Sequence, residues 1–363
     1  MTSIREIFSS FGPEYLQRYA AVIPSTHRKV VDAIIACRTE ACGIAFYQCD
    51  GCAEPQQFFV SCGNRHCPTC QHSKSQQWLQ TQINRQLPGH HFLITFTVPQ
   101  QLRAFLRQHQ RAGYSALFKA SSDAIKKLAL DQKHIGGDLP GFFGVLHTWG
   151  RTLQYHPHIH YVVCGGAMHS SNGSWHPSKI DFFLPVQALS NICRAKFRDL
   201  MTQAKLFDQI PPELWKIAWN VNCQAVGSSQ ATLKYLAPYV FKVAISNSRI
   251  VGLQDRTVLI RYRKSHSQRA RILALDVIEF IRRFLQHVLP TGFMKIRYYG
   301  FMNANCKIAL DRIRGLIELS YGFALDLPVP EIEPPRRSTC PSCGGLLKCR
   351  SVLAPLKILR RSG

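Results

Sequence analysis

The chain has 363 residues, enough for two or three domains with a sizeable core. Its 45 Lys and Arg outnumber 21 Asp and Glu, which gives a formal net charge of +24. Such an excess favours a polyanionic partner, most commonly nucleic acid. No apolar run approaches the roughly 20 residues of a membrane-spanning helix, and the N-terminus lacks the apolar core of a signal peptide. We therefore expect a soluble intracellular protein that binds neither a membrane nor a small-molecule substrate.

Cysteines are concentrated near the N-terminus, where seven of the fourteen lie between Cys37 and Cys70. In an intracellular protein this density favours metal ligation over disulfides. Two Cys-X-X-Cys pairs stand out, and each offers two thiolates at a spacing suited to a tetrahedral ion. Together they predict one closed, structural zinc site formed by Cys49, Cys52, Cys67 and Cys70.

A second zinc site is a candidate in the same segment. Its ligands would be two thiolates and two imidazoles, namely His27, Cys37, Cys62 and His66. Alternatively, the two cysteines are buried thiols, His27 lies on a surface helix and His66 contacts DNA. The module is expected to hold basic side chains such as Arg65 against phosphates, and zinc would also fold a domain that has little core.

The pattern changes after residue 90. A buried strand is predicted for residues 91–98, and apolar residues at helical spacing follow over residues 100–130. Further strands are predicted for residues 141–148 and 158–164, the last one stopped by Gly165 and Gly166, with a hairpin between them. The central sheet should therefore be largely antiparallel. Helices are expected over residues 185–206 and near Tyr235.

His158 and His160 are two residues apart in the last of these strands. On a strand both imidazoles project from one face, while Ile159 points the other way into a core. Two such histidines on a rigid strand can hold a divalent cation. The alternative is a hydrogen-bonded pair in a partly buried strand.

Two imidazoles do not complete the coordination of Mg²⁺ or Mn²⁺, which take about six ligands. Waters, phosphate oxygens and one further side chain must contribute. The candidates for that side chain are His147, Gln154, His156 and a residue near the tyrosines, and the sequence leaves the choice open. No pair of carboxylates in this region has a context typical of a two-metal nuclease.

Tyr235 and Tyr239 are four residues apart, so on a helix they would lie on one side. A metal beside two phenols can cleave a phosphodiester by attack of a tyrosine on phosphorus. Pro238 complicates this arrangement because proline fits only the first turn of a helix. Tyr235 can then precede the helix while Tyr239 lies inside it. The alternative is that both rings belong to an amphipathic helix with hydrated hydroxyls.

The C-terminal third is strongly basic, with fifteen Lys and Arg against four Asp and Glu between residues 242 and 314. Residues 258–263 alternate like a strand, and residues 275–289 read as an amphipathic helix. A basic stripe beside Tyr262 suits single-stranded DNA, or else it is only a solvated face. Its members are Arg261, Arg263, Lys264, Arg269 and Arg271.

Beyond residue 328 the composition indicates a linker and a tail. Cys340-Pro-Ser-Cys343 is half of a zinc knuckle, which with Cys349 offers three ligands. The sequence leaves open whether this half knuckle binds metal or is degenerate.

Three motifs together resemble the insertion sequence 91 family of rolling-circle transposases, which belongs to the HUH endonucleases. They are His156-Pro-His-Ile-His160, Tyr235-Leu-Ala-Pro-Tyr239 and Asn64-Arg-His-Cys-Pro-Thr-Cys70. The similarity extends from about His27 to Ile317. It implies that His158 and His160 bind the catalytic Mg²⁺ or Mn²⁺, and that Tyr235 and Tyr239 are the nucleophiles. Pro238 departs from the family pattern and bears mainly on Tyr239.

The expected fold is α+β, with an N-terminal zinc-ribbon-like module, an HUH domain whose antiparallel sheet is flanked by helices, and a basic C-terminal region. The predicted domain boundaries are 1–88, 89–250, 251–327 and 328–363. The expected function is transposition of single-stranded element ends into target DNA through a 5′-phosphotyrosine, in the nucleoid of a prokaryotic cytoplasm. The alternatives are a plasmid relaxase or replication initiator with the same chemistry, and a non-catalytic zinc-dependent DNA-binding regulator. Expected cofactors are catalytic Mg²⁺ or Mn²⁺ and one or two structural Zn²⁺.

Overall fold

The computed structural model describes most of the chain as two compact units, each assembled from separate parts of the sequence. The described residues are 2–85, 87–228, 244–264, 267, 269–322 and 339–354, without the side chains of 72–75 and 228. The first unit comprises residues 1–75, 241–288 and 330–363, and the second comprises residues 76–240 and 289–329.

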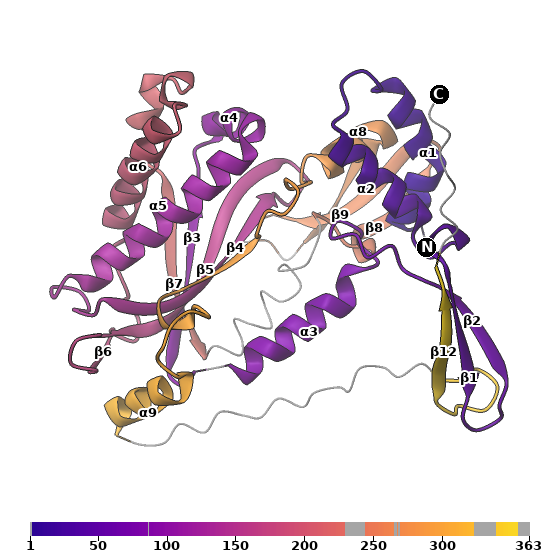
Figure 1. Ribbon diagram of the computed structural model, residues 1–363. Coiled ribbons are helices and arrows are strands. Elements are labelled where there is room, and N and C mark those ends of the chain that lie inside the picture. The colour runs from indigo at the N-terminus through magenta and orange to yellow at the C-terminus, as the bar shows by residue number, and fades with distance from the viewer. Residues whose placement is uncertain are drawn as a thin grey trace. The chain divides into compact units, whose positions relative to one another are not determined.

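A six-stranded antiparallel sheet forms the centre of the second unit (Figure 1). Five strands follow the order β11-β4-β5-β3-β7, and β6 pairs with β5. Strand β5 is therefore central, with β4 on one side and β3 on the other. The strands are β3 (His90–Thr97), β4 (Leu139–Trp149), β5 (Tyr155–Met168), β6 (Trp175–Pro177), β7 (Asn220–Ser228) and β11 (Ile296–Tyr299).

One face of this sheet packs against two long helices, α5 (Gln110–Leu130) and α6 (Val186–Gln203). Ile159 of β5 is fully buried in this core with Phe118 of α5 and Phe197 of α6. Because successive residues of a strand alternate between faces, the neighbours of Ile159 in the chain point to the opposite face.

Among the described residues, two helices pack on parts of that opposite face. Helix α9 (Leu310–Tyr321) packs Ile317 against Cys164 and Met168 at the far end of β5. Helix α3 (Gln71–Asn84), which starts in the first unit, packs Trp78 edge-on against Phe143 of β4 with ring centroids 5.7 Å apart. The remaining elements are η2 (Gln100–Leu102), α4 (Arg103–Gln108), η3 (Phe207–Gln209), η4 (Pro212–Trp215) and η6 (Gly300–Met302).

The predicted central strands and the hairpin between β4 and β5 are confirmed, as is the antiparallel sheet. The predicted helix over residues 100–130 divides at His109 into α4 and α5. The predicted end of β5 at Gly165 and Gly166 is wrong, because β5 continues to Met168. A Cβ at Gly166 would lie 2.5 Å from the Trp175 ring, so the glycine admits β6 rather than ending the strand.

The first unit contains two small antiparallel sheets and three described helices in addition to the start of α3. One sheet has the order β12-β1-β2 and the other β10-β9-β8. Phe8 of α1 packs edge-on against Phe284 of α8 with centroids 5.0 Å apart, and Glu14 forms a salt bridge with Arg256. The elements are α1 (Ile4–Arg18), α2 (Ser25–Ala36), η1 (Glu40–Cys42), β1 (Ile44–Cys49), β2 (Pro55–Phe59), η5 (Asn247–Arg249), β8 (Ile250–Gln254), β9 (Thr257–Arg263), β10 (Ala270–Asp276), α8 (Val277–Leu285) and β12 (Leu347–Leu353).

The predicted fold class is confirmed, since antiparallel sheets are flanked by helices and cysteine clusters lie at the N-terminus. The division into units differs from the predicted domain boundaries. Most of the N-terminal module, much of the basic region and the described tail share one unit, because α1 packs on α8 and β12 pairs with β1. None of the described helices has the length and apolar character needed to cross a membrane.

Gly144 provides a test of the sheet packing. A Cβ at this position would lie 2.4 Å from the ring of Tyr161, which is fully buried and bonded through its hydroxyl to Ser121. We expect Gly144→Ala to destabilise the second unit by about 1–3 kcal/mol, since an overpacked core must shift backbone or side chains. The matched control is Gly252→Ala in β8, whose Cβ would have no neighbour within 4 Å. Urea unfolding of the full chain measures both, and equal stability of the two variants would contradict the packing described.

Candidate functional site

Three histidines lie side by side on the face of the sheet opposite α5 and α6. His147 of β4 is the register partner of His158 of β5, and His160 follows two residues later on the same face. One ligand nitrogen from each ring lies within 4.8 Å of the others. The predicted common face of His158 and His160 is therefore present, and the β4–β5 register adds His147 to it.

Hydrogen bonds orient two of these rings. Nδ1 of His158 donates to the carbonyl of His156 at 2.7 Å, and Nδ1 of His160 lies 2.8 Å from the hydroxyl of Thr95. Each bond leaves Nε2 as the atom available to a ligand. Burial lowers the pKa of His158 well below its usual range, and burial lowers the pKa of His160 to about 4. Both imidazoles are therefore neutral at neutral pH, which is the form that coordinates a cation.

The other candidates for a third ligand have other partners. Nη2 of Arg103, at the start of α4, donates to Nδ1 of His156 at 2.5 Å. The Oε1 atom of Gln154 accepts from the hydroxyl of Thr152 within the hairpin. Of these side chains, the structure brings only His147 into the cluster with His158 and His160.

No carboxylate joins a metal-competent cluster among the described residues. The donor set beside the sheet is three imidazoles. Tyr235 and Tyr239 lie outside the described residues, so their position relative to this cluster stays a prediction.

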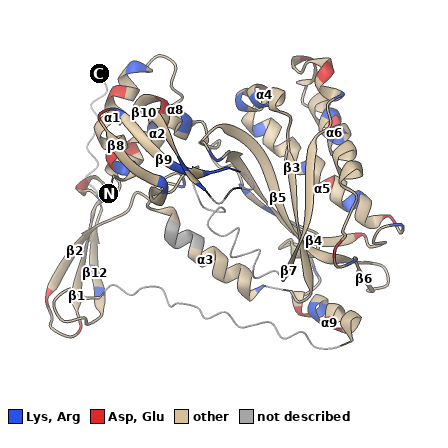
Figure 2. Ribbon diagram, turned by 180° about the vertical axis from the view of Figure 1, so that it is seen from behind, with Lys and Arg blue, Asp and Glu red and all other residues tan. Residues whose placement is uncertain are grey.

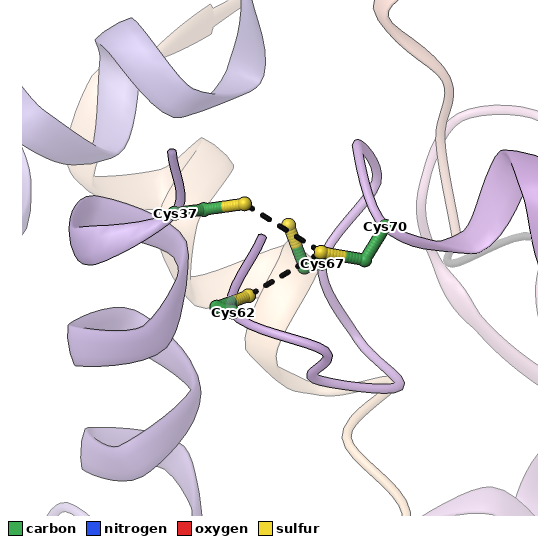
Figure 3. Close-up of side chains that lie close together, drawn as sticks. All are labelled: Cys37, Cys62, Cys67 and Cys70. Carbon is green, nitrogen blue, oxygen red and sulfur yellow. Dashed lines mark hydrogen bonds between the residues drawn. The ribbon is translucent and has the colours of Figure 1, made fainter. Parts of the chain in front are cut away.

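Four cysteines of the first unit also lie close together (Figure 3). Cys37 follows α2, Cys62 lies in the loop after β2, and Cys67 and Cys70 immediately precede α3. The Cys70 sulfur lies 3.5 Å from the sulfurs of both Cys37 and Cys62. A tetrahedral ion with Zn–S bonds of about 2.3 Å places its sulfurs roughly 3.8 Å apart, so this set fits zinc. We call it the first cysteine cluster.

The thiols in this cluster differ in pKa. Hydrogen bonding from Cys62 lowers the pKa of Cys67 to about 5. A lowered pKa favours the thiolate form of Cys67, which is the form that binds zinc.

The predicted grouping of zinc ligands needs correction. Cys49 and Cys52 do not join Cys67 and Cys70; they lie with Cys340 and Cys343 in a second cysteine cluster. The reason is the β1–β2 hairpin, which carries Cys49 and Cys52 at its turn. The open end of this hairpin is closed by the bond from Val60 N–H to Gly43 O. It lies about five residues, or roughly 17 Å along the strands, from the turn that carries Cys49 and Cys52.

The predicted mixed site of His27, Cys37, Cys62 and His66 is also not formed. Its two cysteines belong to the first cysteine cluster, while neither histidine is a member of a metal-competent group. His66 is buried beside Cys67, and its backbone N–H bonds to Asn64 Oδ1 at 2.8 Å. Cys42 and Cys349 lie in neither cysteine cluster.

The predicted DNA-contacting side chains are all exposed in the first unit. Arg261 and Arg263 project from one face of β9, which Figure 2 shows in blue. Arg271 is the register partner of Tyr262 and so lies on the other face of this sheet. The basic stripe is thus divided between two faces. The exposed set is Arg65, Arg261, Arg263, Lys264, Arg269 and Arg271.

Two family models match this chain. Residues 141–309 match one described as "Putative transposase", and residues 7–98 match one described as "Transposase zinc-binding domain". The chain is 33% identical to the "Putative transposase y4qJ" of Sinorhizobium fredii, over 94% of this chain and 92% of that protein. It belongs to the insertion sequence 91 family of transposases.

A second relative supports the same family. The transposase for insertion sequence element IS801 of Pseudomonas savastanoi pv. phaseolicola is 27% identical over 80% of this chain and 74% of that protein. No solved structure is significantly similar to this chain. The histidine cluster lies within the segment matched as a transposase, and the first cysteine cluster lies within the segment matched as a zinc-binding domain.

The first cysteine cluster makes a specific prediction for this transposase. Cys37→Ser should lower the zinc content by about one ion per chain and unfold the segment around it, because metal binding and folding are coupled in such modules. His27→Ala and Cys42→Ser are matched controls that should keep the wild-type zinc content. Elemental analysis of the purified full chain measures all three. Zinc loss in His27→Ala as well as in Cys37→Ser would restore the mixed site, and retention in Cys37→Ser would contradict the first cysteine cluster.

Proposed function

We propose that this transposase nicks and rejoins single-stranded DNA through a 5′-phosphotyrosine intermediate in rolling-circle transposition. The observation that carries the proposal is the cluster of His147, His158 and His160 on one face of the central sheet. Membership of the family supports it, and Tyr235 and Tyr239 supply the nucleophiles.

The three imidazoles suit a divalent cation. Their nitrogens lie within 4.8 Å of one another, and two of the rings are held by bonds to their Nδ1 atoms. A cation bound here polarises the phosphoryl oxygens of the scissile phosphate. Imidazole ligands fit Mn²⁺ better than Mg²⁺, whose preferred ligands are oxygens.

The tyrosine provides the remaining chemistry. Its phenol, with an ordinary pKa near ~10, loses a proton as its oxygen attacks phosphorus. The Tyr–O–P bond forms and the bond from phosphorus to the 3′ oxygen breaks, which leaves a free 3′ hydroxyl. Rejoining reverses these events with the hydroxyl of another strand. The guanidinium of Arg103 lies beside His156, two residues from His158, and adds positive charge for the phosphate backbone.

Two other functions would use some of the same residues. A plasmid relaxase or replication initiator would use the same histidines and tyrosines, and family membership favours the transposase. A DNA-binding regulator without catalysis would need the cysteine clusters but not three histidines grouped on one sheet face.

DNA contact is the role we assign to the exposed basic residues of the first unit. Arg261 and Arg263 project from one face of β9, where their guanidinium groups can contact the phosphates of a single strand. Such contacts depend steeply on salt because counterions are released on binding.

The central prediction is a covalent adduct. Full-length protein mixed with a single-stranded oligonucleotide carrying its element end should give a labelled band that survives boiling in detergent, and only when Mg²⁺ or Mn²⁺ is present. Mn²⁺ should support the reaction at a lower concentration than Mg²⁺. Absence of an adduct on every element-end strand would favour the regulator.

Single substitutions can distinguish the role of the three clustered histidines from that of neighbouring residues. His158→Ala, His160→Ala and His147→Ala should each lower the nicking rate by at least about 10-fold, as for loss of a metal ligand, while single-strand binding changes only a few-fold. Gln154→Ala, a change in the adjacent hairpin outside the cluster, is the matched control and should nick normally. Normal nicking by His147→Ala would show that the third ligand is another group.

The tyrosines are expected to be unequal because proline disfavours a helical conformation in the residue before it, and Pro238 lies between them in the sequence. Tyr235→Phe should abolish first-strand nicking, whereas Tyr239→Phe should spare nicking and reduce complete transposition. The substitution removes only a hydroxyl, so packing is little changed. Adduct formation by the double variant would mean that the nucleophile lies elsewhere.

A further inference from the structure

The second cysteine cluster joins parts of the chain that are far apart in sequence. The Cys49 sulfur lies 3.4 Å from that of Cys343, and the Cys52 sulfur lies 3.7 Å from that of Cys340. All four sulfurs lie within 4.8 Å of one another. The matched zinc-binding domain ends at residue 98, so it includes only half of this set.

The two halves have the same local conformation. In each, the N–H four residues after the first cysteine donates to the carbonyl of that cysteine: Ala53 to Cys49 at 3.0 Å and Gly344 to Cys340 at 2.9 Å. Both donors have positive φ, 58° at Ala53 and 73° at Gly344. A pair of equivalent Cys-X-X-Cys turns facing each other is the geometry of a four-thiolate zinc site.

Backbone groups also approach the sulfurs. Gly51 N–H lies 3.3 Å from the Cys49 sulfur, and Gly345 N–H lies 3.4 Å from the Cys343 sulfur. A Cβ at Gly345 would lie 2.9 Å from the Cys49 sulfur, so glycine is needed where the two turns meet. Such N–H groups stabilise thiolates that ligate a metal.

The surrounding sheet is arranged to bring the two halves together. Strand β12 pairs with β1 from Ile44–Leu353 to Cys49–Leu347, and Asp50 N–H bonds to Leu346 O at 2.9 Å. Lys348 forms a salt bridge with Asp50 at 2.9 Å. Backbone hydrogen bonds and an ion pair therefore hold β12 on β1, in addition to the proximity of the four thiols.

We propose that Cys49, Cys52, Cys340 and Cys343 bind a second structural Zn²⁺, which fastens residues 339–354 to the β1–β2 hairpin. The whole second unit lies in sequence between the two halves of this site. The site is separate from the first cysteine cluster, so the chain holds two zinc ions.

Zinc content of the full chain tests this site. Wild-type protein should contain about two Zn²⁺ per chain, and Cys343→Ser should contain about one. Cys343→His keeps a zinc ligand at this exposed position and should retain about two. Cys349→Ser is the matched control, since Cys349 is an exposed tail cysteine outside the cluster, and it should also retain two.

Cobalt substitution gives an independent readout. The thiolate-to-Co²⁺ charge-transfer absorbance should fall by about half in Cys343→Ser and remain near the wild-type value in Cys343→His. One zinc in the wild type, or two in Cys343→Ser, would overturn the proposal. So would two disulfides detected by a thiol count in denaturant after metal chelation.

Discussion

The antiparallel register of β4, β5 and β3 determines which side chains meet on the face of the sheet that carries the three histidines. His147 stands opposite His158, and Thr95 stands opposite His160, so the third imidazole of the cluster and the hydroxyl beside His160 come from the two neighbours of one strand. A one-residue slip of β4 would send His147 into the core and Leu146 onto the ligand face. Large buried side chains prevent that slip, since Leu146 and Ile159 pack against α5 and α6.

The same alternation explains which parts of the site were predictable. His158 and His160 could be assigned to one face from their spacing alone, because that relation is internal to a strand. His147 could not be chosen over His156 or Gln154, because its place depends on the register across a hairpin. The sequence contains part of the information that selects His147, because a short turn after Trp149 brings residue 147 opposite the start of the His158 segment. The bulge before Trp149 then sets the final register.

The cysteines show the limit of reasoning from neighbouring motifs. Counting Cys-X-X-Cys pairs correctly indicated zinc, and the two nearest pairs were assigned to one ion. Strands β1 and β2 separate those pairs, so each finds partners elsewhere: one among Cys37 and Cys62, the other in the C-terminal tail. Only long-range strand pairing between β1 and β12 reveals that Cys340 and Cys343 are half of a complete set.

The position of the second cysteine cluster has a consequence for synthesis of the protein. The ribosome makes Cys49 and Cys52 long before their partners Cys340 and Cys343, which follow almost 300 residues later in the sequence. The thiols of the first half must remain reduced and unpaired while the second unit, which lies between the two halves in sequence, is translated and folds. Closure of this cluster therefore requires that the second unit has already been synthesised, and a chain that terminates before residue 343 cannot close it.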